Sequence, residues 1–162
     1  MLSSVQPHPF NERQFHFSRL FLKTGPVLIV KKQVQKEVIE KMMRKEIAVD
    51  SRIHEALLIE HYPEAIVRFY DIIPEALNEV VSDRIDGAIV NYIPAISFVQ
   101  DLYKKELKIA SLPLDNTGLR MVALKDKQRE LMKIFNEGLD TLKREGVYEK
   151  LALKWGLYPE KE

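Results

Sequence analysis

The side chains that could do chemistry stand at the ends of two predicted strands, and their types suit binding rather than catalysis. Ser51 and Arg52 follow a strand predicted at 46–49, and Asn91 follows a strand predicted at 87–90. A hydroxyl, a guanidinium and a carboxamide hold polar groups and anions through hydrogen bonds. These positions therefore indicate a site for a small polar solute.

The reactive groups of the common enzyme classes are missing from the sequence or lack partners. The chain has no cysteine, which excludes disulfides, thiolate catalysis and Cys-based metal sites. No serine has a nucleophile-elbow context, the six glycines form no phosphate loop, and no acidic pair has an arguably buried environment. The histidines have no metal-ligand spacing, and we interpret them as solvated or capping residues: His8, His16, His54 and His61. We predict no enzyme activity, no metal and no cofactor.

The composition of the chain limits the classes of molecule that it could bind. Lys and Arg number 25 and Asp and Glu 24 among 162 residues, a net charge of +1 without the basic excess of nucleic-acid-binding proteins. Hydrophobic residues at 46% and charged residues at 30% are typical of a globular domain. The amino terminus lacks the pattern of a secretory signal, and the longest aliphatic run, Val27–Val30, is too short to span a bilayer. We therefore expect a water-soluble chain without an address label.

Hydrophobic periodicity predicts alternating strands and helices that would position these side chains. Residues 1–25 are irregular in pattern, and the predicted strands cover 27–30, 46–49, 65–70, 87–90, 107–110 and 119–124. The predicted helices cover 33–44, 52–61, a segment from Pro74, 94–103, the core stripe 131–142 and 147–155. This alternation predicts a mostly parallel sheet covered on both faces. Ligands of such sheets bind outside the carboxyl ends of strands, so Asp50–His54 and Asn91–Pro94 should converge at one edge.

Four segments of the chain are similar to the signatures of one protein family. They are Phe17-Ser18 with Gly25 and Val27–Lys31, then Ile47–Ser51 with Tyr62-Pro63, then Glu75–Asn91, and finally Leu139–Gly156 with its closing Lys-Trp-Gly. Each motif alone is common, but the four occur in the family's order over nearly the whole chain. The chain thus resembles the family 3 solute-binding proteins of bacterial ABC importers, which capture polar amino acids between two α/β lobes.

The resemblance implies a fold and a domain division. The implied fold is a type II periplasmic-binding-protein lobe, with a mostly parallel five-stranded sheet, helices on both faces and added C-terminal helices. Residues 1–25 would be a remnant of the first lobe with the hinge, 26–120 the second lobe, and 121–162 the return hinge strand and the C-terminal helices of the first lobe. The family's signal peptide and most of its first lobe have no counterpart, so a fragment, a displaced start or a reduced descendant is expected.

The resemblance also places the ligand site, and its main positions have changed. The positions that it assigns to ligand binding are Ser4, Gln6, Asn11, Arg13, Ser51, Arg52, Ile53 and Asn91. Asn11 stands where the family has a carboxylate-binding arginine, with Arg13 two residues beyond, and Asn91 replaces the ammonium-binding Asp. Two accounts remain open: Arg52 has taken over anion binding and shifted the ligand preference, or the cleft has lost its ligand and Arg52 is only solvated.

The resemblance implies a solute-binding component of an amino-acid-type ABC importer, with altered or lost ligand binding. The implied partners are a polar solute, either an amino acid or an organic anion, and the importer's membrane subunits in a periplasmic or cell-surface setting. Exposed first-lobe elements would favour a homo-oligomer or domain swap. A sensory or structural domain of the same fold is the alternative, and a dehydratase-like enzyme is a remote one.

Overall fold

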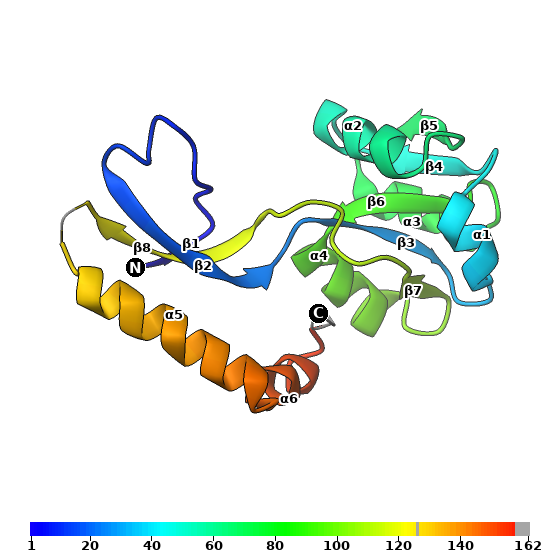
Figure 1. Cartoon of the computed structure of the whole chain (residues 1–162). Coiled ribbons are helices and arrows are strands. Elements are labelled where there is room, and N and C mark those ends of the chain that lie inside the picture. The colour runs from blue at the N-terminus through cyan, green and yellow to red at the C-terminus, as the bar shows by residue number, and fades with distance from the viewer. Residues whose placement is uncertain (126, 158–162) are drawn as a thin grey trace. The chain divides into compact units, whose positions relative to one another are not determined.

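A computed structural model describes residues 1–125 and 127–157, which fold into two compact units (Figure 1). Gly25–Asp115 form an α/β unit, and Met1–Thr24 form the other unit together with the described residues from Asn116 onward. The chain leaves the α/β unit after Asp115, before strand β8 (Gly118–Leu124). Strand β8 therefore belongs to the same unit as Met1–Thr24.

The α/β unit is built on a five-stranded sheet with the order β5-β4-β6-β3-β7. The strands are β3 (Pro26–Lys31), β4 (Glu46–Val49), β5 (Ile66–Phe69), β6 (Gly87–Asn91) and β7 (Leu107–Ile109). β4 pairs in parallel with β5 and β6, whereas β3 pairs antiparallel with both β6 and β7. Four strands therefore run in one direction and β3 runs against them, which confirms the predicted α/β sheet and adds its one reversed strand.

The helices of this unit are α1 (Lys36–Lys41), α2 (Arg52–His61), α3 (Ile73–Val81) and α4 (Tyr92–Ser97), and α4 continues as a π-helix over Phe98–Leu102. The helix predicted at 33–44 is shorter than expected, because Val34 lies in a turn and Met42 ends the helix with φ at 45°. The helix predicted at 94–103 begins two residues early, directly after β6.

The core of the unit follows from the alternation of side chains along each strand. Leu28, Val30, Ile47, Val49 and Ile89 face one side of the sheet and cluster with side chains of α1 and α2. The intervening residues, Val27, Ile29, Ala48, Ala88 and Val90, are also buried, so both faces are covered. Figure 1 shows α2 on one side of the sheet and α4 on the other. The strands read as continuous apolar runs because neither face is open to water.

The other unit contains a three-stranded antiparallel sheet with the order β1-β8-β2, where β1 is Leu2–Ser3 and β2 is Phe15–Lys23. The prediction that residues 1–25 are irregular is wrong for β2. The pairing of β2 with β8 shifts register between Phe17 and Leu20 and again between Leu20 and Leu22. Such bulges break the period-two alternation by which a strand is recognised in a sequence.

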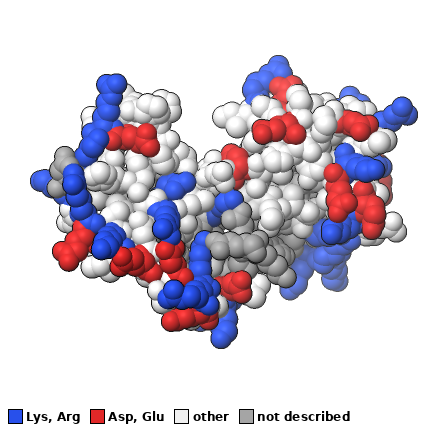
Figure 2. Space-filling view, in the orientation of Figure 1, with Lys and Arg blue, Asp and Glu red and all other residues white. Residues whose placement is uncertain are grey.

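Helix α5 (Arg129–Arg144) packs on β2 and is followed by α6 (Val147–Lys154). Phe135 meets Phe21 edge to face with ring centroids 6.1 Å apart, and Met132 and Leu139 are buried. The interpretation of 131–142 as a core stripe is wrong for Leu131, Ile134 and Leu142, which are 45%, 58% and 40% exposed. Basic and acidic side chains are intermixed over the visible face of this unit (Figure 2).

Candidate functional site

The two predicted site loops meet at one edge of the five-stranded sheet. Ser51 follows β4 and Asn91 is the last residue of β6, and these two strands are parallel neighbours. His54 of α2 brings the loops into contact, because its Nε2 lies 3.3 Å from Asn91 Oδ1. The predicted convergence of Asp50–His54 with Asn91–Pro94 is thereby confirmed.

Ser51 sets the geometry of this edge by starting helix α2. Its backbone is extended, and its Oγ accepts a hydrogen bond of 3.2 Å from the amide of His54. A serine at this position satisfies one of the amides that the first turn of a helix leaves without an intrahelical acceptor. Ser51 therefore fixes the start of α2 and, with it, the position of His54 above the end of β6.

His54 lies at the end of the predicted loop Asp50–His54 but was not among the residues that the sequence assigned to the site. It is only 5% exposed, so its interpretation as a solvated histidine is wrong. Its Nδ1 lies 2.7 Å from Asp50 Oδ1, a distance suited to an ion pair although the alignment falls outside hydrogen-bond geometry. The available signal was the position of Asp50 directly before the Ser51 cap, four residues ahead of His54 in the first turn of α2.

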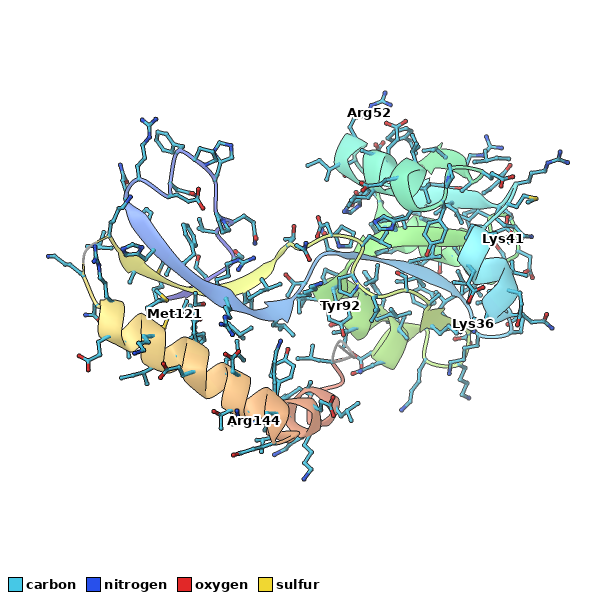
Figure 3. The ribbon with its side chains drawn as sticks, viewed as in Figure 1. Lys36, Lys41, Arg52, Tyr92, Met121 and Arg144 are labelled. Atoms are coloured by element: carbon cyan, nitrogen blue, oxygen red, sulfur yellow. The ribbon has the colours of Figure 1, made fainter. Side chains whose placement is uncertain are left out.

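Arg52 and Ile53 lie on the outer surface of the first turn of α2. The Arg52 side chain is 81% exposed and points outward from the helix (Figure 3). It donates a hydrogen bond of 2.7 Å to Glu55 Oε2, and its guanidinium carbon lies 4.7 Å from the centre of the Phe69 ring. Ile53 is 72% exposed. The guanidinium is thus engaged within its own unit by a carboxylate and an aromatic face.

The remaining predicted residues belong to the unit of β1, β2 and β8. Gln6 donates from Nε2 to the carbonyl oxygens of Ser4 and Gly118, at 2.9 and 2.8 Å. Asn11 donates to the Gln6 carbonyl at 2.9 Å and accepts from the His8 amide at 2.8 Å. The side chains of Gln6 and Asn11 therefore hold their own loop together. Ser4 and Arg13 are exposed.

Charged groups at the opposite end of β4 form a separate network. Arg68 donates two hydrogen bonds to Glu46, and these lower the pKa of the Glu46 carboxyl and raise the pKa of Arg68. Asp86 accepts from the Glu46 amide at 2.9 Å and pairs with Lys45 at 2.9 Å. Glu46 begins β4, so this network braces the start of the strand whose far end carries the site.

A hollow of about 390 Å³ lies between β2 and α5. It is lined by His16, Phe17, Arg19, Arg129, Met132, Lys133, Asn136, Glu137 and Asp140. Arg19 pairs with Asp140, and its amide donates to Asn136 Oδ1 at 2.9 Å. Because cations and anions share the lining, the hollow favours no single charge class of ligand. Within the described residues, no three His, Asp or Glu side chains gather closely enough to hold a metal ion.

The chain is similar to known proteins over nearly its whole length. The model of the bacterial extracellular solute-binding proteins, family 3, matches residues 1–158. ABC transporter arginine-binding protein 1 of Escherichia coli (strain K12) is 24% identical over 161 residues, covering 96% of this chain and 65% of that protein. The arginine-binding extracellular protein ArtP of Bacillus subtilis (strain 168) is 27% identical over 161 residues, covering 96% of this chain and 62% of that protein. The chain thus spans a little under two thirds of the length of these relatives.

A solved structure supports the fold independently. The crystal structure of an ancestral cyclohexadienyl dehydratase matches with a TM-score of 0.70 and 23% identity, covering 94% of this chain and 65% of that one. At this identity the likeness concerns the fold, and it confirms the predicted α/β class. No helix within 1–125 or 127–157 has both the length and the apolar character needed to cross a membrane.

Proposed function

Because the chain belongs to the bacterial extracellular solute-binding proteins of family 3, we propose that it is the solute-binding component of an amino-acid-type ABC importer. The proposed binding edge is the meeting point of the α2 start and the end of β6. The observation that carries the proposal is the contact between His54 and Asn91, which joins two strand-end loops into one polar surface. Solutes of open α/β sheets bind at such strand ends.

The proposed ligand carries a carboxylate, but its recognition differs from that of an ordinary amino acid. The Ser51-capped start of α2 offers amides and a hydroxyl suited to an anionic group. Asn91 supplies a neutral carboxamide, which cannot neutralise an ammonium. A neutral hydrogen bond is weaker than a charge-assisted one by about 1–2 kcal/mol, so α-amino acids should bind less tightly than their relatives without the ammonium.

Binding is tested by titration calorimetry and thermal shift with L-arginine, L-glutamine, dicarboxylates and phosphate. The expected result is a saturable shift with at least one carboxylate, weakened about tenfold by Ser51→Ala and unchanged by Ser82→Ala. Ser82 is the matched control because its hydroxyl serves only α3, donating to the Asn78 carbonyl at 2.9 Å. No shift with any of these solutes would contradict the proposal.

The proposed partners and setting follow from the family. Its members are extracellular, and we assign this chain to the cell exterior or periplasm, where it would deliver its solute to the membrane subunits of an importer. The α/β unit would serve as the second lobe, and the unit of β1, β2, β8, α5 and α6 would belong to the first. The exposed Leu131, Ile134 and Leu142 on α5 favour self-association, which light scattering of wild type and Ile134→Glu would reveal.

Binding without turnover is the proposed activity. The matched curated relatives are arginine-binding proteins. Because the fold is similar to that of a dehydratase, catalysis by this chain is tested by incubation with prephenate and arogenate, followed by product analysis. Turnover of either compound would replace binding with catalysis as the activity of this chain.

A further inference from the structure

Three polar side chains at the binding edge form a chain of contacts with His54 in the middle. The ring Nδ1 lies 2.7 Å from Asp50 Oδ1, and the ring Nε2 lies 3.3 Å from Asn91 Oδ1. His54 is 95% buried, whereas Asn91 is exposed. A buried imidazole therefore separates a carboxylate from a carboxamide that faces outward.

The chemistry of these groups couples the ring to the outward face of Asn91. Nδ1 makes no hydrogen bond to Asp50, so the direction of the contact between Nε2 and Asn91 decides which group of the amide faces outward. If Nε2 has no proton, it must accept from the Asn91 amide nitrogen, which leaves the Asn91 oxygen outward. If Nε2 carries a proton, it donates to Oδ1, and the amide NH₂ is left to face outward.

The two arrangements select different solutes. An outward oxygen accepts hydrogen bonds and suits an ammonium, whereas an outward NH₂ donates and suits a carbonyl or carboxylate oxygen. In the structure Oδ1 is turned to Nε2, so the ring nitrogen is the donor of this contact. The outward group is then the NH₂.

We propose that His54 is a specificity-determining residue that turns the Asn91 amide NH₂ toward the solute, so that the edge selects an oxygen acceptor over an ammonium. The proposed ligand class is a 2-oxo acid or a carboxylate without an α-ammonium. His54 acts through Asn91 as a positioning residue and does not itself touch the solute. This inference rests on the proposed function, because it assumes that the solute binds at this edge.

The first experiment needs no ligand. Long-range ¹H–¹⁵N correlation spectra of the full chain, with His54 assigned through His54→Gln, report the protonation of both ring nitrogens. The expected spectrum has a proton on Nε2, which donates to Asn91 Oδ1. A wild-type ring without a proton on Nε2 would overturn the inference.

The second experiment measures selectivity with matched pairs of solutes. The pairs are L-glutamate with 2-oxoglutarate, L-alanine with pyruvate, and L-arginine with 5-guanidino-2-oxopentanoate, which differ only in the α-substituent. For every pair of which a member binds, the 2-oxo acid should bind about tenfold more tightly to the wild type. Asn91→Asp should reverse that preference, because a carboxylate accepts from both the ring and an ammonium.

Asn78→Asp is the matched control, since it adds the same charge on α3, where Asn78 Oδ1 accepts from Tyr103 at 2.9 Å. It should leave the preference unchanged. If neither member of any pair binds, the spectra alone decide the inference about the ring, and the proposed function stands or fails with the broader panel of solutes. If pairs bind but the amino acid is preferred by the wild type, the inference fails and the proposed function stands.

Discussion

Arg68 on β5 holds the carboxylate of Glu46 on the neighbouring strand β4, with Nε 3.0 Å from Oε2 and Nη2 2.7 Å from Oε1. The guanidinium and the carboxylate are planar groups of matching geometry, so the pair forms two parallel hydrogen bonds. The contact ties β5, the edge strand, to the strand that leads into the binding edge. It also favours the ionised form of Glu46 and so lowers the pKa of that carboxyl.

The pair predicts how stability depends on pH. A carboxyl whose pKa is lower in the folded state contributes its full stabilisation above its ordinary value of 4.5 and loses it as pH falls through the folded pKa. Arg68→Gln should therefore lower the melting temperature near neutral pH and have little effect at strongly acidic pH. Circular dichroism melts across this range measure the difference. Arg144→Gln is the control, and a pH-independent effect of Arg68→Gln would contradict the assignment.

We predict that the Ser51 cap of α2 contributes to the free energy of unfolding. Ser51→Ala removes the acceptor of the His54 amide and should cost about 1 kcal/mol of unfolding free energy in urea titrations. Ser82→Ala should change it by less than about 0.5 kcal/mol, because Ser82 caps no helix start. Equal effects of the two substitutions would mean that Ser51 does not act as a cap.

We predict that removing the Asp50 carboxylate beside His54 destabilises the protein. Asp50→Asn keeps the shape of the side chain but removes the charge 2.7 Å from a buried ring nitrogen. The expected loss of stability is about 1–3 kcal/mol, measured by chemical denaturation. Asp71→Asn provides a comparison at an exposed position and should be nearly neutral. A neutral Asp50→Asn would show that the ring does not depend on this carboxylate.

We predict that substitution by alanine has opposite effects on stability at Gly87 and at Gly138. A Cβ on Gly87 in β6 would lie 2.8 Å from the carbonyl oxygen of Ile29 and 3.2 Å from Ile47 Cδ1, so Gly87→Ala should force neighbouring strands apart and destabilise the protein by at least about 1 kcal/mol. Gly138 lies within α5 with nothing within 4 Å of an added Cβ. Gly138→Ala should therefore stabilise the helix by up to about 1 kcal/mol. Thermal melts of both variants test the pair, and a stabilising Gly87→Ala would refute the close packing at β6.

The layout of the α/β unit could be predicted from hydrophobic periodicity, because periodicity is a local property of the chain. Continuous apolar runs such as Val27–Val30 predict buried strands, and helices between them predict crossovers that bring parallel strands together. That information was enough to predict that the loops after β4 and β6 meet at one edge, which the contact of His54 with Asn91 confirms.

The burial and the contacts of the side chains at that edge could not be predicted, because they depend on residues that are distant in sequence. Asn91 is 37 residues from His54 in sequence, so their contact depends on the pairing of β4 with β6 and on where α2 begins. The bulges of β2 hid a nine-residue strand from any test of alternation. On α5, apolar spacing did not reveal that Met132 is buried while Ile134 is exposed, because burial depends on the surface against which a helix packs.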